Sequence, residues 1–294
     1  MPYFFVINPS AGRRVGDARA LVDSVFSGKD IKYEVEYTRA RGHASELAAR
    51  ALLRGFDKIV AVGGDGTIRE TAASLVGKEA ALGIVPCGSG NGLARNLYIP
   101  LSPAKAAAGL LSWEPRLIDS GLVNGQPFFC ASGAGLDAEV AHDFNSLTKR
   151  RGILPYVWHA AKRVLAFKPR EVLVRVDGAE HRVTALLTAV LNGVQYGGGA
   201  RIAPGAYIDD GRLDFCAVKP APLYRLAAAV PALFSGRLAD HPEIYSTLRG
   251  QVIELDCGGP AWYHLDGEDF HSESGLIKIS VVPASLKVLA PRPC

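Results

Sequence analysis

Lys58-Ile59-Val60-Ala61-Val62-Gly63-Gly64-Asp65-Gly66-Thr67 is the stretch that decides the fold of this chain. Its first half is a mostly apolar run typical of a buried strand, and residues 67–75 have the composition of a helix. The glycines between them permit positive φ and close approach of an anion, and Thr67 is a candidate N-cap. Because such a turn presents backbone N–H groups and the positive end of a helix dipole, the stretch predicts a phosphate-binding loop.

Asp65 is the unusual residue of this loop. A carboxylate repels phosphate unless a metal ion or a proton intervenes, so its presence favours phosphate chemistry over simple phosphate binding. The competing interpretation is an Asx turn beside glycines. We favour the chemical role because the neighbouring glycines bring no other side chain that could act.

The first part of the chain alternates between the two kinds of secondary structure. Strand-like segments occur at 3–7, 33–37, 58–62 and 82–85, and helix-like segments at 16–26, 42–54, 67–75 and 103–111. This alternation predicts a parallel sheet covered by helices. Ligands of such sheets bind at the carboxyl ends of strands, where loops 8–13, 63–67 and 86–91 are expected.

After Pro115 strand-like segments dominate, at 116–122, 127–132, 171–176, 181–191, 212–218, 251–256, 261–265 and 276–282. They predict an antiparallel β-rich domain of two packed sheets, with helical insertions at 155–167 and 223–234. The second insertion is apolar enough to be buried. We expect domains at 1–118 and 119–283, a tail at 284–294 that packs back on the first domain, and an active site in the cleft between the domains.

Composition limits the class of protein. The chain has 294 residues, 48% of them hydrophobic, and a formal net charge of +4, which is too weak to indicate nucleic acid but is compatible with anionic ligands or an anionic membrane surface. Its five cysteines lack CxxC spacing, which favours a reducing compartment and argues against zinc. With no signal-peptide pattern and no apolar run of about 18 residues, a cytoplasmic location is expected.

Several motifs occur together in the order typical of one family. They are Asn8-Pro9-Ser10-Ala11-Gly12, Thr38 with Gly42-His43-Ala44, the 63–67 loop, Pro86-x-Gly88-Ser89-x-Asn91, Gly197-Gly198-Gly199-x-x-x-Ala203-Pro204, Asp209-Asp210-Gly211-x-Leu213-Asp214 and Leu265-Asp266-Gly267-Glu268. Along its whole length the chain thus resembles the diacylglycerol kinase catalytic domain family, which includes soluble bacterial lipid kinases and sphingosine and ceramide kinases. The resemblance implies a phosphofructokinase-like α/β domain before a β-sandwich, and ATP- and Mg²⁺-dependent phosphorylation of a lipid hydroxyl.

The same resemblance assigns the nucleotide site. The residues expected to contact ATP are Asn8, Thr38, Gly63, Gly64, Gly66, Thr67, Glu70, Gly88 and Ser89, with Arg13 placed to meet phosphate oxygens. Taken alone, Asn8 would be a turn residue, and Thr38 and Ser89 would be helix caps or polar loop residues.

The resemblance places the catalytic carboxylate at Glu268, although Asp266-Gly267 alone would indicate only a hairpin turn. Asp65 and Glu268 are then expected to meet across the cleft, one orienting metal and the other accepting the hydroxyl proton, in an order left open. A second, oxygen-only metal site is expected at Asp210 with the carbonyls of Tyr207 and Arg212. Its alternative is a plain Asp-Gly turn.

The lipid itself is left open. The third loop lacks the Asn-Asp pair usual in soluble bacterial diacylglycerol kinases, and its Gly-Ser-Gly-Asn form looks more like sphingosine and ceramide kinases. Asn91 and Glu139 are the candidate substrate-binding residues. Residues 156–168 mix basic and large apolar side chains, so they predict either a helix that contacts anionic membrane or, as the favoured alternative, a core-packed helix with a basic edge. A homodimer is left open.

Three other functions compete. The first is another kinase of the same superfamily, such as an NAD or sugar-phosphate kinase, and the second is a non-catalytic lipid- or nucleotide-binding regulator. Retention of Asp65 and Glu268 argues against the regulator. A dehydrogenase would rest only on the G-x-G-x-x-A match at 133–138, which lacks the acidic residue expected about 20 residues later; we favour a tight turn there.

Overall fold

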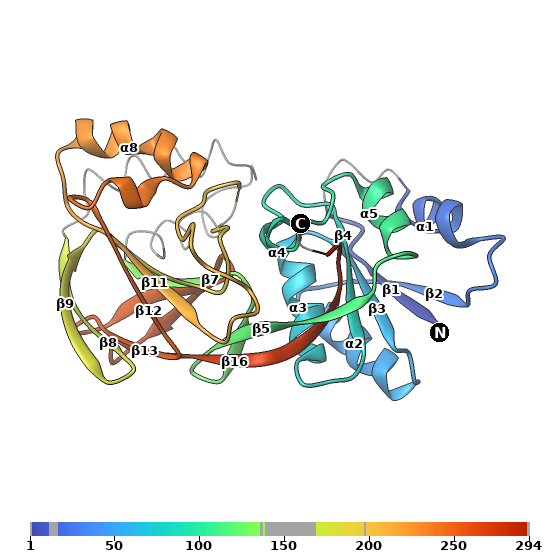
Figure 1. The fold of residues 1–294 in the computed structure, drawn as a ribbon. Helices are drawn as coiled ribbons and strands as arrows, with labels where there is room; N and C mark the ends of the chain where they lie inside the picture. The colour runs from blue at the N-terminus through green and yellow to red at the C-terminus, as the bar shows by residue number, and fades with distance from the viewer. Residues whose placement is uncertain (1, 12–16, 136–137, 139–168, 197, 293–294) are drawn as a thin grey trace. The chain divides into compact units, whose positions relative to one another are not determined.

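The fold is described from a computed structural model, for residues 2–11, 17–135, 138, 169–196 and 198–292 (Figure 1). The chain divides into two compact units. The N-terminal unit comprises Met1–Ile118 together with Ala284–Cys294, and the C-terminal unit comprises Asp119–Pro283.

The N-terminal unit is built on a parallel sheet. Its strands run in the order β2 (Tyr33–Tyr37), β1 (Tyr3–Ile7), β3 (Lys58–Gly63), β4 (Ala81–Pro86) and the end of β16 (Leu276–Leu289). The helices between and after these strands are α1 (Ala18–Phe26), α2 (His43–Leu53), α3 (Asp65–Leu75), α4 (Gly92–Asn96) and α5 (Pro103–Gly109). The predicted α/β class is confirmed, although α4 was not expected.

Both faces of this sheet are covered, since every residue of β1 is buried. This is usual for a strand of a parallel sheet. Phe5 stacks edge-on against Phe26 of α1, with ring centroids 5.1 Å apart. Phe4, which points to the opposite face, packs against Phe56 at 5.1 Å. These aromatic contacts pack α1 on one face of the sheet and the segment between α2 and β3 on the other.

The last part of β16 completes this sheet. Val288 pairs with Leu82 of β4, and Leu289 is part of the buried core of the N-terminal unit. The N–H of Gly77 donates to the carbonyl of Ser285 at 2.7 Å. The chain therefore completes its first unit with a segment that follows the 165 residues of the second unit, so β16 belongs to both units.

The C-terminal unit contains two antiparallel sheets. One has the order β12 (Tyr245–Gly250), β11 (Leu213–Val218), β10 (Leu187–Leu191), β7 (Ala131–Gly135), β14 (Ala261–Leu265) and β15 (Glu268–Ser272). The other joins the first part of β16 to β13 (Val252–Asp256), β8 (Arg170–Val176) and β9 (Ala179–Ala185), while β5 (Pro115–Val123) and β6 (Gln126–Phe128) form a hairpin. Phe215, Val174 and Leu255 from both sheets share one buried core, which confirms the predicted antiparallel β domain.

Two local expectations for this unit are wrong. Gly133, Ala134 and Gly135 lie inside β7 and pair with β10, so the first half of the G-x-G-x-x-A match is strand and not the expected tight turn, while residues 136–137 lie outside the described residues. Helix α8 (Leu223–Ser235) is exposed instead of buried: Ala229 is its one buried residue. An apolar sequence indicates what a helix can pack against, but only the tertiary structure supplies the partner.

The expected helix at 155–167 lies outside the described residues. Within the described ranges, no helix combines the length and the apolarity that crossing a bilayer requires.

Candidate active site

Four loops meet at the carboxyl edge of the parallel sheet in the N-terminal unit. Asn8 follows β1, Thr38 follows β2, Gly64 follows β3 and Gly88 follows β4. Main-chain hydrogen bonds continue the sheet into these loops, since the N–H of Asn8 donates to Val62 at 3.0 Å and that of Thr38 to Ile7 at 2.8 Å. The predicted nucleotide residues are thus brought together by strand order alone.

Asp65 is the first residue of α3 and ties two of these loops together. Its Oδ2 accepts from the N–H of Asn91 at 2.9 Å and its Oδ1 from the N–H of Gly92 at 2.7 Å. Gly92 begins α4, so the carboxylate binds donors that have no partner within that helix. Both oxygens of Asp65 therefore hold the loop after β4 against the loop after β3.

The glycines of these loops are needed for space. A Cβ on Gly88 would stand 2.7 Å from the Cα of Gly64, and one on Gly63 would stand 2.7 Å from the Cβ of Thr67. Gly63, Gly64 and Gly66 do not adopt the positive φ that glycine permits. Close approach of the Gly64 main chain explains Gly88, and the Thr67 side chain explains Gly63.

Thr67 does not cap the helix. Because α3 starts at Asp65 with Gly64 as its N-cap, Thr67 lies in the first turn, 6% exposed. Its Oγ1 accepts from Nδ2 of Asn8 at 3.0 Å, and Oδ1 of Asn8 accepts from the N–H of Ser10 at 2.9 Å. The two side chains thus join the loop after β1 to the first turn of α3, where the main-chain N–H groups have no partner within the helix itself.

The loop after β4 is closed by Asn91. Its Oδ1 accepts from the N–H of Gly88 at 3.0 Å, its Nδ2 donates to the carbonyl of Gly88 at 2.9 Å, and its φ is 53°. The amide is 2% exposed and engaged at both ends, whereas Ser89 is exposed at the tip. Of these two predicted contact residues, Ser89 is the one whose side chain faces solvent.

Glu70 lies on α3 and points at the start of α2. Its Oε1 accepts from the N–H of Gly42 at 2.8 Å and its Oε2 from that of Ala44 at 3.2 Å. Gly42, the N-cap of α2, has no side chain that could do this. The structure therefore gives Glu70 a capping role, in addition to the nucleotide contact that the resemblance implies.

We expect Glu70→Ala to lower the free energy of unfolding by about 1–2 kcal/mol, the usual effect of losing a helix cap. Urea unfolding measures this, with Glu46→Ala on the exposed part of α2 as the control. If Glu70 served nucleotide binding alone, stability would stay the same while the KM for ATP rose.

A hollow of about 170 Å³ lies beside these loops. It is lined by Ile7, Asn8, Pro9, Ala11, Asp17, Ala18, Tyr37, Val62 and Cys87. Burial raises the pKa of the Cys87 thiol to about 11, because the thiolate is poorly solvated there. The thiol is therefore a packing group of this hollow and not a nucleophile at neutral pH.

This pKa predicts slow alkylation. At pH 8 the folded protein should leave Cys87 unmodified by iodoacetamide, together with Cys216, whose pKa burial raises to about 12. Half-buried Cys257 is the internal comparison and should react first. Peptide mapping before and after urea unfolding reads all three sites; rapid labelling of native Cys87 would contradict the buried environment.

In the C-terminal unit, Glu268 begins β15 directly after a hairpin turn. Asp266 and Gly267 form that turn with φ of 49° and 88°, as expected for an Asp-Gly hairpin. The Asp266 carboxylate accepts from three backbone N–H groups, of Phe129 at 2.9 Å, Cys130 at 2.7 Å and Ala131 at 3.0 Å. Asp266 anchors the turn, and Glu268 is held half-exposed beside it.

His264 supports the same hairpin and was missed from the sequence. It is 4% exposed, its Nε2 lies 2.8 Å from the Tyr196 hydroxyl, and its Nδ1 accepts from the N–H of Gly267 at 3.4 Å. A histidine on an inward position of a strand four residues before the candidate catalytic acid is the signal that could have found it.

The predicted metal ligands Tyr207, Asp210 and Arg212 lie in one turn before β11. Oδ1 of Asp210 accepts from the N–H of Arg212 at 3.1 Å, and its Oδ2 lies 3.7 Å from Nη1 of Arg249. Asp119, buried within β5, accepts from the N–H of Gly211 at 2.6 Å and was also missed. An acid inside an apolar strand segment was its signal.

The charges around this turn are balanced by Arg249. Its Nε lies 3.1 Å from Oδ1 of Asp214. Burial raises the pKa of the Asp214 carboxyl, and the nearby Arg249 only partly offsets this effect. Across the part of the chain that the structure describes, no group of three or more His, Cys, Asp or Glu residues is arranged to hold a metal ion. A site at Asp210 would have to rely on backbone carbonyls.

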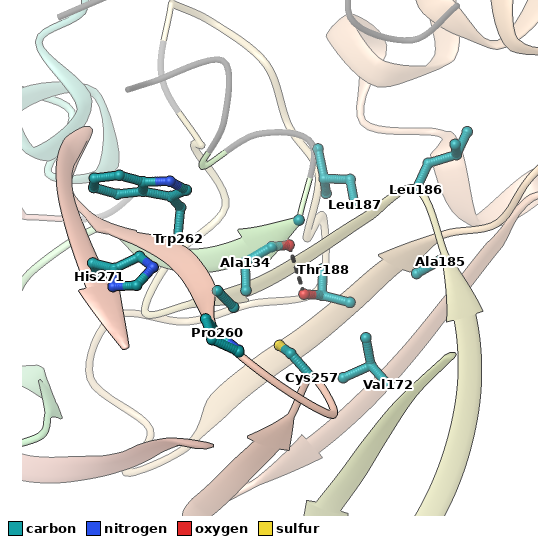
Figure 2. A pocket seen from close by; sticks show the side chains of 12 residues that line it. Ala134, Val172, Ala185, Leu186, Leu187, Thr188, Cys257, Pro260, Trp262 and His271 are labelled. Atoms are coloured by element: carbon teal, nitrogen blue, oxygen red, sulfur yellow. Dashed lines mark hydrogen bonds between the residues drawn. The ribbon is translucent and has the colours of Figure 1, made fainter. Parts of the chain in front are cut away.

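A second hollow, of about 250 Å³, lies in the C-terminal unit (Figure 2). Trp262 and His271, from neighbouring strands and with ring centroids 4.9 Å apart, lie on one side of it. The hydroxyl of Thr188 donates to the carbonyl of Ala134 at 2.8 Å, and the lining as a whole exposes polar and apolar surface in about equal parts. The remaining lining residues are Gly135, Val172, Ala185, Leu186, Leu187, Cys257, Pro260 and Ala261.

Arg13, Glu139 and the basic stretch 156–168 lie outside the described residues, so their predicted roles stay predictions.

Comparison with known proteins gives matches over the whole chain. The model of the diacylglycerol kinase catalytic domain matches residues 2–123, and that of the YegS C-terminal NAD kinase beta sandwich-like domain matches residues 131–290. A diacylglycerol kinase of Bacillus subtilis is 31% identical over 90% of this chain and 88% of its own length. One of Mycobacterium tuberculosis is 32% identical over 85% of this chain and 82% of its own.

Solved structures agree on the fold. The crystal structure of a diacylglycerol kinase from Bacillus anthracis aligns with a TM-score of 0.73 at 19% identity, covering 99% of this chain and 97% of that one. The predicted order of an α/β domain and a β-sandwich domain is confirmed.

Proposed function

The chain belongs to the diacylglycerol kinase family, and on that premise we propose that it transfers the γ-phosphoryl group of ATP to a hydroxyl of a membrane lipid. The proposal rests on the position of Asp65 at the start of α3. Its carboxylate accepts hydrogen bonds that hold the glycine-rich loops after β3 and β4 together. Main-chain N–H groups with no side chains in front of them are the donors that a triphosphate needs.

ATP fits these loops on structural grounds. Because Gly88 lacks a Cβ, its loop can approach Gly64 closely at the start of α3, where the first main-chain N–H groups of a helix have no partner within the helix. Exposed Ser89 adds a hydroxyl donor, and the hollow beside Asn8 offers room for more of the nucleotide. We assign Asn8, Thr38, Gly64, Thr67 and Ser89 to this site.

In the proposed reaction, the lipid hydroxyl oxygen forms a bond to the γ-phosphorus as the bond from that phosphorus to the bridging oxygen of ADP breaks. The hydroxyl proton passes to the carboxylate of Glu268. We assign the proton to Glu268 and not to Asp65, because both oxygens of Asp65 already accept main-chain N–H groups. Asp65 then positions the loops that hold the triphosphate.

Mg²⁺ would neutralise triphosphate charge during this transfer. A further Mg²⁺ would be held by Asp210 with the carbonyls of Tyr207 and Arg212, a donor set of oxygens that suits the ion. Arg249 already compensates part of the charge on Asp210, so we propose that this second site binds metal weakly. Metal analysis of the purified protein, with and without Arg249→Ala, tests this.

The hollow of the C-terminal unit is our proposed place for part of the lipid. Its lining exposes polar and apolar surface in about equal parts, so it could contact both hydrocarbon and polar groups of a lipid.

The test is turnover on a lipid panel. The purified chain with ATP and Mg²⁺ is offered diacylglycerol, sphingosine, ceramide and monoacylglycerol in detergent micelles, with NAD as the alternative acceptor, and products are read by mass spectrometry. A phosphorylated lipid is expected. Phosphorylated NAD, or no product from any acceptor, would overturn the proposal.

A further inference from the structure

Helix α8 exposes an apolar surface that its sequence alone would place in a core. Leu223 is 56% exposed, Tyr224 69%, Val230 48% and Phe234 44%. Helices that are apolar on all sides are normally buried, and those on a protein surface normally carry charges outward. α8 contains no Asp, Glu or Lys, so its outer surface is mostly apolar. Among the described residues, none buries this surface.

The exposed side chains form one face. Leu223, Val230 and Phe234 are seven and four residues apart and so lie one above the other, while Tyr224 borders them. Ala229, on a different side, is the buried residue that seats the helix. The carbonyl of Leu233 accepts from the N–H of Arg201 at 2.9 Å, so α8 is held in place with this face outward. Figure 1 shows α8, in orange, outside the strands of the C-terminal unit.

Basic side chains border this face at both ends. Arg225 is exposed in the first turn, and exposed Arg201 packs beside Gly236 just after the last turn, where a Cβ on the glycine would stand 3.3 Å from Cδ of the arginine. Residues 215–239 contain no Asp or Glu. Arg237 is paired with Asp240, so Arg201 and Arg225 carry the positive charge of the face.

From this arrangement we propose that α8 docks the C-terminal unit on an anionic lipid surface. A helix with an outward apolar face and arginines at its ends matches the boundary between acyl chains and anionic head groups, where both kinds of group are satisfied at once. A second copy fits less well, because antiparallel packing of two such helices would bring Arg225 of one chain toward Arg201 of the other.

Docking through α8 would place the C-terminal unit on the membrane from which the lipid is taken. This purpose rests on the proposed function, whereas the docking itself does not. Docking itself needs no turnover. It is measured with the full chain, without ATP, by co-sedimentation with vesicles of phosphatidylcholine alone or mixed with phosphatidylglycerol.

The wild-type chain should bind the mixed vesicles. The triple variant Leu223→Ser, Val230→Ser, Phe234→Ser should bind them at least about tenfold more weakly. The double variant Arg201→Gln, Arg225→Gln should bind the mixed vesicles about tenfold more weakly than wild type. It should then bind both kinds of vesicle with similar affinity. Leu53→Ser is the matched control: Leu53 is 90% exposed in the N-terminal unit, and this variant should bind like wild type. Leu223→Asn alone serves if the triple variant melts early.

The proposal is overturned if the triple serine variant binds the mixed vesicles like wild type. It is also overturned if Leu53→Ser weakens binding as much as the triple variant does. A change from dimer to monomer on sedimentation without any change in vesicle binding would overturn it too, and would assign the face to a second copy. Turnover of lipid in detergent micelles is assayed alongside. If it is absent while vesicle binding behaves as expected, the proposed function fails and docking stands; if it is present while the variants bind vesicles normally, docking fails alone.

Discussion

Glu268→Gln should lower kcat by about 10²–10⁴ while ATP binding stays within twofold of wild type. Glutamine keeps the size and hydrogen-bonding reach of the side chain but cannot accept a proton, so the loss measures general-base catalysis. Because Asp266, and not Glu268, anchors the hairpin through three N–H groups, the turn should fold as before. Steady-state kinetics and titration with a fluorescent ATP analogue give the two readouts.

Glu273→Gln is the matched control for this variant. Glu273 lies just after β15 with its side chain 89% exposed beside His271, and its loss should leave kcat unchanged. Near-normal turnover in Glu268→Gln would remove Glu268 from the chemistry and return the proton to Asp65 or to another acceptor.

Asp65→Ala should reduce both activity and stability. Two charge-assisted hydrogen bonds to Asn91 and Gly92 are lost, each worth about 1.5–3 kcal/mol, and because the residue is half-buried we expect about 2–4 kcal/mol in total. The loop after β4 would move away from the start of α3. Since a displacement of about 1 Å can reduce the rate about 100-fold, kcat/KM for ATP should fall by that order or more.

Asp65→Asn separates the two roles of this residue. Asparagine retains one oxygen acceptor, so it should recover part of the stability but leave one N–H unsatisfied. Glu79→Ala is the control in the same unit, since its carboxylate is 99% exposed in an ion pair with Lys287 and its loss should leave stability nearly unchanged. Unchanged stability in Asp65→Ala, together with lost turnover, would indicate direct action on metal or substrate instead of loop positioning.

The elements that the sequence predicted well are those whose local pattern coincides with their tertiary role. β1 and β3 are apolar along their length because a parallel strand is covered on both faces, and the glycine turn after β3 is required by close packing. The Asp266-Gly267 turn likewise follows from its own two residues. In these places local chemistry and the global fold favour the same conformation.

The functions of polar side chains were less predictable. Glu70 caps a helix whose N-cap, Gly42, lies 28 residues earlier, and Asp119 accepts from the N–H of Gly211 in a turn 92 residues later. α8 illustrates the same limit for apolar residues: its composition indicates burial, yet in the described part of the chain four of its large apolar side chains are exposed. Each of these outcomes depends on contacts between distant segments, which periodicity does not record.

By itself, then, the sequence determined the strand–turn–helix around Asp65, the change from alternating to β-rich organisation and the family to which the chain belongs. Only the tertiary structure decided that the Asp65 carboxylate joins two loops, that Asn91 is engaged with its own turn and that α8 faces outward. The physical reason is that a buried strand or a glycine turn is favoured by its own residues, whereas a hydrogen bond or an exposed face depends on what the folded chain brings beside it.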